Sequence, residues 1–354
     1  MKPFRSAVLF ALPALVVLTA FVSANVIGRG ERPADEPGRV LPPPIPPQPG
    51  DPVDALIDDL EIGPAERHGA LTIYPLRRRH DSGFVPLTFD EGVSHGDVVV
   101  RELARSRVNE VEVQNRSRRD LFLMGGQMLF GSKQDRIFQR DALIPPHSEW
   151  VRVPVYCVER GRWTPVSKHF SGKGRAVAPA LRRAAQESAS QEEIWSGVAR
   201  QRNEFSVSKG RTGAYGAIYE DDEVQSRLRE YRERLRPVLQ RGTCGVVVVG
   251  RQGIICADIF GDRALFAQLW HSLLDSYVLD EGKRGWGPES DEHSVREFLR
   301  GARSDRSGHH HTPTPGIGDA LRISGPTSGA ALSFRRDAVH VDLYPTLYRP
   351  LMER

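Results

Sequence analysis

Four consecutive polar residues, Lys133 to Arg136, interrupt an apolar part of the chain that reads GGQMLFGSKQDRIFQRD. They place an ammonium, an amide, a carboxylate and a guanidinium on one short turn between two runs that are typical of β-strands. Such a set can orient a polar ligand, stabilise a developing negative charge or carry a proton. The flanking glycines allow a ligand to approach the backbone closely. The alternative is a charged turn in water, where Asp135 pairs with a neighbouring cation for at most about 1 kcal/mol.

A second polar stretch, CVERGRW, follows the last strand that we expect in the N-terminal half. If this strand lies beside the strand that leaves the turn, Glu159 and Asp135 share one edge of a sheet. The two carboxylates could then act as general base and acid, while cations hold an anionic ligand and Trp163 stacks on it. The candidate catalytic residues are Lys133, Asp135 and Glu159. The candidate ligand-binding residues are Gln127, Gln134, Arg136, Arg162 and Trp163.

Short runs rich in β-branched and aromatic residues extend from Leu71 to Cys157 and predict strands. In VNEVEVQN, Val111 and Val113 fall on one face and the charged and amide residues fall on the other. This alternation is typical of an antiparallel sheet with one face in water. Residues 62–165 are therefore predicted to form a sandwich or a partly open barrel.

The chain then becomes helical over residues 178–241 and mixed α/β over residues 242–354. Ser190 with Glu193 predicts a capping box, and Asp222 and Asp262 are expected to cap two later helices. The predicted fold class is α+β, with an antiparallel β-rich N-terminal half, then helices and a small C-terminal sheet. These parts are expected to form a single domain over residues 62–354.

The three cysteines are expected to be buried thiols, because three are few for an exported protein of this size. Cys244 and Cys256 lie in a predicted hairpin with its tip at Arg251 and Gln252, which places Cys256 opposite Val247. In this register the two thiols point to opposite faces, so no disulfide is expected. Residues 309–311 are consecutive histidines and are read as a solvated loop, with adventitious zinc or nickel binding as the alternative. No metal site is predicted.

The N-terminus has the pattern of an export segment. Two cations precede an apolar run over residues 7–22, and the small-residue site Val22-Ser23-Ala24 ends it. Residues 1–28 are predicted to be either a cleaved signal peptide or a membrane anchor, for which residues 7–27 approach the necessary length. The proline-rich residues 29–61 are predicted to be a linker. The domain is therefore expected outside the cytoplasm, secreted, periplasmic or anchored to the cell membrane.

Composition limits the function classes. The net charge of +4 is small and the cations are interleaved with carboxylates, so no nucleic-acid partner is expected. The chain has no H-E-x-x-H, G-x-S-x-G, phosphate-loop or paired C-x-x-C pattern, which leaves metalloprotease, nucleophile-elbow hydrolase and nucleotide triphosphatase unsupported. The sequence leaves the cofactor, any protein partner and the oligomeric state open.

The segment from GGQMLFGSKQDRIFQRD to CVERGRW resembles the signature of a bacterial domain family, the ARG-and-rhodanese-phosphatase-superfamily-associated protein domain. The later segments IWSGVARQ and VVVVGRQGIICADIFGDRALFAQLWHSLLDSY are similar to its second half. The family name implies an association with ADP-ribosylglycohydrolases, hence an ADP-ribose or NAD-derived ligand, but it implies no particular reaction. The prediction is therefore a small anionic nucleotide- or sugar-like ligand, bound or processed. The alternative is a non-catalytic envelope scaffold or protein-interaction module.

Overall fold

The computed structural model describes residues 50–103, 109–207, 210–239, 242–281 and 290–346. The chain divides into two compact units, Met1–Leu41 and Pro42–Arg354, and every described residue lies in the second. That unit buries three hydrophobic cores among its own residues, so the chain from Pro42 onward contains the contacts that hold its fold together. The predicted export segment lies outside the described residues. Within the described ranges, no helix is both long and apolar enough to cross a bilayer.

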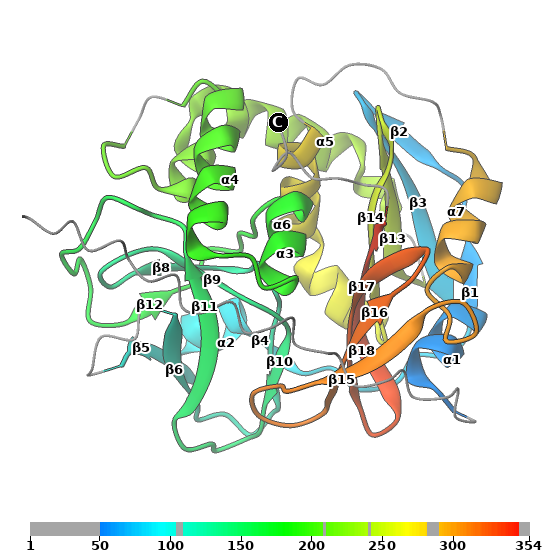
Figure 1. The fold of residues 1–354 in the computed structure, drawn as a ribbon, viewed down its shortest axis with the longest axis horizontal. Helices are drawn as coiled ribbons and strands as arrows, with labels where there is room; N and C mark the ends of the chain where they lie inside the picture. Colours follow the sequence, from blue (N-terminus) through cyan, green and yellow to red (C-terminus); the bar gives the residue numbers. More distant parts are fainter. Residues whose placement is uncertain (1–49, 104–108, 208–209, 240–241, 282–289, 347–354) are drawn as a thin grey trace, which may run out of the picture. The chain divides into compact units, whose positions relative to one another are not determined.

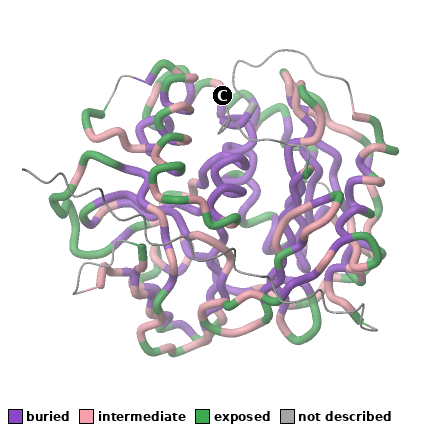
Figure 2. The backbone as a smooth tube through the Cα atoms, in the orientation of Figure 1, coloured by how far each residue is buried: buried purple, intermediate pink, exposed green. Residues whose placement is uncertain are grey.

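The largest sheet has nine antiparallel strands in the order β1-β3-β13-β14-β18-β17-β16-β15, with β2 paired to β3 (Figure 1). Alternate valines of β13 point to opposite faces of this sheet, so both faces are buried. Helix α6 packs on one face, and α1 and α7 contribute to the core on the other (Figures 1 and 2). The strands are β1 Leu60–Ile62, β2 Glu66–His68, β3 Leu71–Arg78, β13 Thr243–Gly250, β14 Gly253–Phe260, β15 Gly308–Thr312, β16 Asp319–Ser324, β17 Thr327–Phe334 and β18 Asp337–Pro345.

The second sheet has six strands in the order β12-β8-β9-β11-β6-β5, and its edge strands β12 and β5 lie close together, so it forms a nearly closed barrel. Val111 and Val113 point into the barrel and their neighbours face outward, as the alternation predicts. The strands are β5 Val98–Glu102, β6 Glu110–Asn115, β8 Met128–Gly131, β9 Arg136–Phe138, β11 Val151–Cys157 and β12 Phe170–Ser171. A three-stranded sheet adds β4 Leu87–Thr88, β7 Leu121–Leu123 and β10 Ala142–Ile144.

The helices begin at the expected caps with one shift. The capping box of Ser190 and Glu193 is present. The Asp262 carboxylate accepts a hydrogen bond from the backbone N–H of Ala264 at the start of the helix that follows it. Asp221, and not Asp222, caps the next helix, because its carboxylate accepts the backbone N–H groups of the first turn. The helical elements are α1 Pro52–Asp58, α2 Phe89–His95, α3 Pro179–Gln186, α4 Gln191–Glu204, η1 Tyr215–Glu220, α5 Asp222–Arg234, η2 Arg236–Val238, α6 Arg263–Glu281 and α7 Glu292–Arg300.

The α+β class and its order of elements are confirmed, but the C-terminal sheet is larger than expected. Strands β1 to β3, which lie in the β-rich N-terminal half of the sequence, pair with the C-terminal strands through β13. The folded part also starts before the predicted boundary at residue 62, since α1 buries Val53, Leu56 and Ile57. Those side chains fill the core beneath α7 and make the end of the predicted linker part of the fold.

Two local predictions are wrong. Cys256 lies opposite Val248 and not Val247, because a bulge between Val248 and Val249 shifts the hairpin register by one residue. The three cysteines are nevertheless buried and free, as expected. The consecutive histidines form strand β15 instead of a solvated loop, and His309 and His310 are buried. The buried His309 ring is paired with a carboxylate, since its Nδ1 lies 2.9 Å from Asp51 Oδ2.

A buried charge network joins α3, the barrel and the large sheet. Arg182 of α3 binds Asp258 through two hydrogen bonds of 2.7 and 2.8 Å. His340 of β18 links two carboxylates: its Nε2 lies 3.2 Å from Asp258 Oδ1, and its Nδ1 lies 2.6 Å from Oδ2 of Asp141, which directly precedes β10. Gly126 has a φ of +78°, and a Cβ there would lie 2.2 Å from the Arg182 side chain, so glycine is required for this approach. Burial opposes the charged form of His340, but the two carboxylates outweigh burial and raise its pKa to about 10.

Candidate functional site

The polar turn connects β8 to β9 and has a left-handed backbone. Gly131 has a φ of +111° and Ser132 a φ of +49°, a conformation that costs a non-glycine residue roughly 1–2 kcal/mol. This backbone directs the Ser132 carbonyl toward the loop that follows β11. There it accepts hydrogen bonds from Arg162 Nη1 at 2.6 Å and from the Val166 N–H at 2.9 Å. The turn and the second polar stretch are therefore held together by direct contacts.

Asp135, Glu159 and Arg162 form an ion-pair cluster behind this turn. Strand β9 pairs with β11, with Arg136 opposite Cys157, and this register places the ends of the two strands side by side. Arg162 Nη2 lies 2.9 Å from Asp135 Oδ1 and 2.5 Å from Glu159 Oε2. The Asp135 N–H also donates to Glu159 Oε2 at 3.1 Å. The expected adjacency of the two carboxylates is present, and Arg162 bridges them.

The two carboxylates of the cluster differ in their ionisation. Burial acts to raise the pKa of Glu159, but hydrogen bonds from Arg162, Thr212 and the Asp135 N–H outweigh it and lower that pKa. Burial also opposes the charge of Arg162, whose pKa is nonetheless raised by Glu159 and Asp135. For Asp135, burial prevails and the nearby Glu159 charge adds to it, so its pKa is raised. Glu159 is thus the ionised partner of Arg162, and Asp135 is the carboxyl that takes up a proton more readily.

Three other predicted site residues differ in their surroundings, and only Gln134 contacts a residue of the cluster. Gln134 is fully buried and donates to the Glu159 carbonyl at 2.7 Å. Gln127 is buried and donates to Asp90 Oδ2 at 2.7 Å. Trp163 is 57% exposed.

Lys133 and Arg136 both contact Glu102 at the end of β5. Lys133 Nζ lies 3.6 Å from Glu102 Oε2, and Arg136 Nη2 lies 3.2 Å from Glu102 Oε1. Lys133 is exposed and Arg136 is buried. The structure therefore brings Asp135 and Glu159 together and directs Lys133 to a different carboxylate. The catalytic roles of these three residues stay a prediction.

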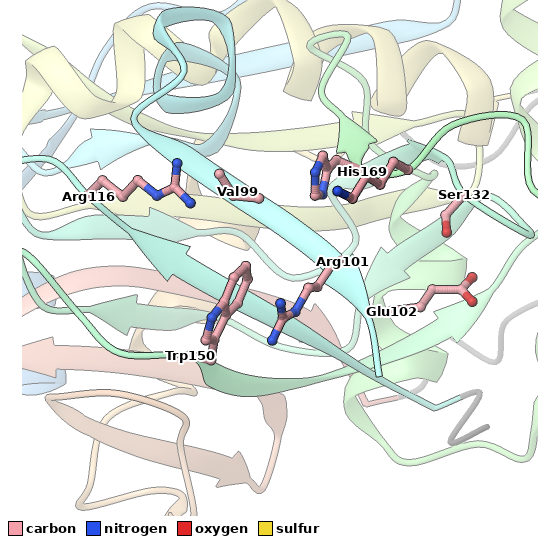
Figure 3. A pocket seen from close by; sticks show the side chains of 8 residues that line it. Val99, Arg101, Glu102, Arg116, Ser132, Trp150 and His169 are labelled. Atoms are coloured by element: carbon pink, nitrogen blue, oxygen red, sulfur yellow. The ribbon is translucent and has the colours of Figure 1, made fainter. Parts of the chain in front are cut away.

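An open groove of about 650 Å³ lies next to the turn, on the outer face of the barrel (Figure 3). Its volume falls in the range typical of small-molecule sites. Val99 and Arg101 lie on the outward face of β5, and Arg101 extends toward Trp150 (Figure 3). Arg116 lies at one end of the groove, and Glu102 and Ser132 lie at the other (Figure 3). The lining residues are Val99, Arg101, Glu102, Arg116, Ser132, Trp150, Lys168 and His169.

Cations outnumber carboxylates along this groove. Glu102 is already paired with two cations; burial opposes its charge, but the Lys133 N–H and Arg136 outweigh burial and lower its pKa. Arg101 donates to Glu112 at 2.9 Å and lies over the Trp150 ring, 3.6 Å from its centroid. Arg116 donates to the neutral Gln114 at 2.9 Å. Among the described residues, Arg116 and Lys168 have no carboxylate within ion-pair distance, so their charges face the solvent of the groove.

The groove residues are absent from the sequence predictions because they are scattered over five separate stretches. Arg101 and Arg116 come from β5 and the end of β6, Trp150 precedes β11, and Lys168 precedes β12. The available signal was the polar face of the β6 alternation, which marks the outer surface of the barrel. The sequence did not indicate which neighbouring strands share that surface.

The family model for the ARG and Rhodanese-Phosphatase-superfamily-associated Protein domain matches residues 59–344. The match includes the ion-pair cluster and the whole groove. No curated protein and no solved structure matches the chain.

Proposed function

We propose that this chain, which belongs to the ARG and Rhodanese-Phosphatase-superfamily-associated family, binds a small phosphate-bearing ligand in the groove beside the polar turn. One observation carries the proposal. Arg116 and Lys168 present their charges to an open groove of about 650 Å³, and the one carboxylate among the described residues that line it, Glu102, is already neutralised by Lys133 and Arg136. Cations arranged in this way attract anions, and arginine in particular pairs with phosphate through two parallel hydrogen bonds.

The surroundings of Arg116 favour a ligand with more than one anionic group. Arg116 also lines a second hollow of about 360 Å³, which includes Arg118, Arg119 and the carboxylates Glu91 and Asp97. Arg119 is already paired with Glu91 at 2.8 Å, so a ligand with two phosphates would contact Arg116 from the groove and Arg118 from this hollow. Trp150 and the Arg101 guanidinium that stacks on its ring both line the groove, and planar groups of these kinds stack on nucleobases or sugars. Together with the association in the family name, these features make ADP-ribose the ligand to test first.

The ion-pair cluster supports binding better than turnover. A general acid or base must reach a reacting atom within about 3 Å, directly or through one water. In this structure Arg162 donates to both Asp135 and Glu159, so both carboxylates are engaged within the protein. Processing of the ligand by Lys133, Asp135 and Glu159 would require Arg162 to leave this position. A non-catalytic scaffold or protein-interaction module is the second candidate, and the same engaged carboxylates favour it.

We also propose that the domain acts outside the cytoplasm, on the pattern of the N-terminal apolar run. A fusion of residues 1–50 to an enzyme that is active only after export tests this part. Export activity that disappears on deletion of residues 7–22 is expected. An inactive fusion that is produced in full would contradict it.

The ligand proposal is tested by a thermal-shift screen of residues 42–354 with ADP-ribose, NAD, sugar phosphates and inorganic phosphate. A bound ligand raises the melting temperature by mass action. Arg116→Ala and Lys168→Ala are expected to reduce the shift without changing the melting temperature of the free protein. Arg79→Ala is the matched control, because Arg79 is an exposed arginine that follows strand β3 of the large sheet, pairs with Glu61 and does not line the groove. No shift with any of these ligands would favour the scaffold reading.

A further inference from the structure

The loop between β11 and β12 exposes a cluster of apolar side chains. Residues 163–169 are all exposed, and Trp163 is 57% and Val166 67% accessible. Only one further large apolar side chain among the described residues is exposed, Leu239 at 38%. Pro165 lies between the two, so the tip of the loop is apolar over four residues with one threonine. Exposed apolar clusters of this kind mark contact surfaces.

The base of this loop is held by a set of hydrogen bonds. Arg162 binds the ion-pair cluster and the Ser132 carbonyl, and the Val166 N–H donates to the same carbonyl at 2.9 Å. Ser167 Oγ accepts from the Ser132 N–H at 2.8 Å and donates to the His169 carbonyl at 2.8 Å. The tip is therefore presented outward by a defined structure. A preorganised tip loses little conformational entropy on contact with a partner.

Three exposed cations lie on this loop or just after β12, and the two carboxylates bound to the base of the loop are buried. Arg160 and Lys168 are exposed on the loop, and Lys173 is exposed two residues after β12. Arg160 lies over the ring of Trp195 and Lys173 over the ring of Phe130, at 5.3 and 4.6 Å from the centroids, so neither charge is neutralised by these contacts. Asp135 and Glu159, which are the carboxylates bound to Arg162, are buried. The loop thus combines an apolar tip with a positive rim.

We propose that the loop Arg160–Lys173 contacts the surface of an anionic lipid bilayer, with Trp163 and Val166 in the headgroup region. Tryptophan favours this region because its ring is apolar and its N–H is polar. Lysine and arginine near the surface each contribute through attraction to anionic headgroups. The occupant follows from this charge complementarity together with the apolar tip. The predicted anchor and proline-rich spacer would keep the domain within reach of a bilayer, since each extended residue spans about 3 Å.

The apolar tip is separate from the groove, because Trp163 and Val166 do not line it, whereas Lys168 belongs to both surfaces. The cationic variant in the test is therefore at Lys173, which does not line the groove. The proposed partner of this surface is an anionic lipid bilayer, and absence of binding to anionic vesicles would overturn the proposal.

The experiment is co-sedimentation of residues 42–354 with vesicles, since these residues lack the apolar run 7–22. Binding to vesicles of phosphatidylglycerol and phosphatidylcholine is expected, with little binding to phosphatidylcholine alone. The double variant Trp163→Ser, Val166→Ser is expected to bind about tenfold more weakly or worse, because both apolar groups that enter the bilayer are removed. Lys173→Glu is expected to weaken binding at least about fivefold, since it removes a surface cation.

Leu239→Ser is the matched control, because it removes an exposed apolar side chain elsewhere and is expected to leave binding unchanged. Thermal midpoints of all variants confirm that each is folded. The proposal is overturned if the wild-type protein does not sediment with anionic vesicles. It is also overturned if the folded double variant sediments as well as wild type, or if Leu239→Ser loses as much binding as the double variant.

Discussion

The ion-pair cluster and the groove use the same residue types on adjoining parts of one barrel, but they use charge in different ways. In the cluster, Arg162 is shared by Asp135 and Glu159 and is largely excluded from water. In the groove, Arg116 and Lys168 have no carboxylate partner among the described residues and face solvent. A buried, fully paired charge fixes the position of the backbone around it, and an exposed, unpaired cation is available to a ligand. The cluster therefore holds the turn in place, and the groove presents the cations that a ligand can bind.

The largest effect is expected from breaking the cluster. Arg162→Met leaves two carboxylates buried without a cation, which typically destabilises a protein by about 3–5 kcal/mol. Urea unfolding of residues 42–354 measures this loss. The triple variant Asp135→Asn, Glu159→Gln, Arg162→Met removes the uncompensated charges and should regain much of the stability. If Arg162→Met is as stable as wild type, the cluster does not hold the turn.

The buried charge network of Arg182, Asp258, His340 and Asp141 gives a second test, because raising the pH removes the charge of His340. His340 has a pKa of about 10 in the folded protein against an ordinary value of 6.5, so its stabilising contribution is complete below about pH 6.5 and is lost as the pH rises through about 10. The slope reaches at most about 1.4 kcal/mol per pH unit in that window. Unfolding free energies between about pH 7 and about 9.5 should fall for wild type and less steeply for His340→Gln. Equal slopes would contradict a charged His340.

Ionic strength should affect ligand binding in the groove more than the stability that the ion-pair cluster provides. Exposed charges are screened by salt much more than buried pairs. Raising the ionic strength from about 50 to about 300 mM should therefore weaken ADP-ribose or phosphate binding several-fold while the unfolding free energy changes little. Calorimetric titration and urea unfolding at the two salt concentrations provide both numbers. Ligand binding that is insensitive to salt would mean that the groove cations do not hold the anion.

The smallest effect is expected at Lys133. Its ammonium is exposed and lies 3.6 Å from Glu102, which is a surface ion pair of about 0–1 kcal/mol. Lys133→Ala should unfold within about 1 kcal/mol of wild type, because Arg136 still pairs with Glu102. A loss of several kcal/mol would show that the exposed side of the turn carries more of the fold than its contacts indicate.

The sequence predicted most of the elements and part of their arrangement. The repeat of apolar residues identified the outward face of β6 and the buried side of α6, and the spacing of Ser190 and Glu193 identified the capping box. These patterns involve residues that are close in the sequence. The sequence also anticipated that Asp135 and Glu159 meet, because the strand that begins after Asp135 and the strand that ends before Glu159 were expected to be neighbours. It did not predict that β3 joins the large sheet or that His310 is buried in a strand, since both depend on pairing between distant segments. The groove was missed for the same reason.

The most direct measurement is a calorimetric titration of ADP-ribose, with inorganic phosphate as the simpler anion, into wild type and three folded variants. The account predicts that Arg116→Ala binds about 10- to 100-fold more weakly, because it loses charge-assisted hydrogen bonds. Lys133→Ala and Glu159→Gln, measured where they remain folded, should bind within a few-fold of wild type. The reverse result, normal binding by Arg116→Ala and lost binding by folded Lys133→Ala and Glu159→Gln, would place the site at the turn and contradict the account.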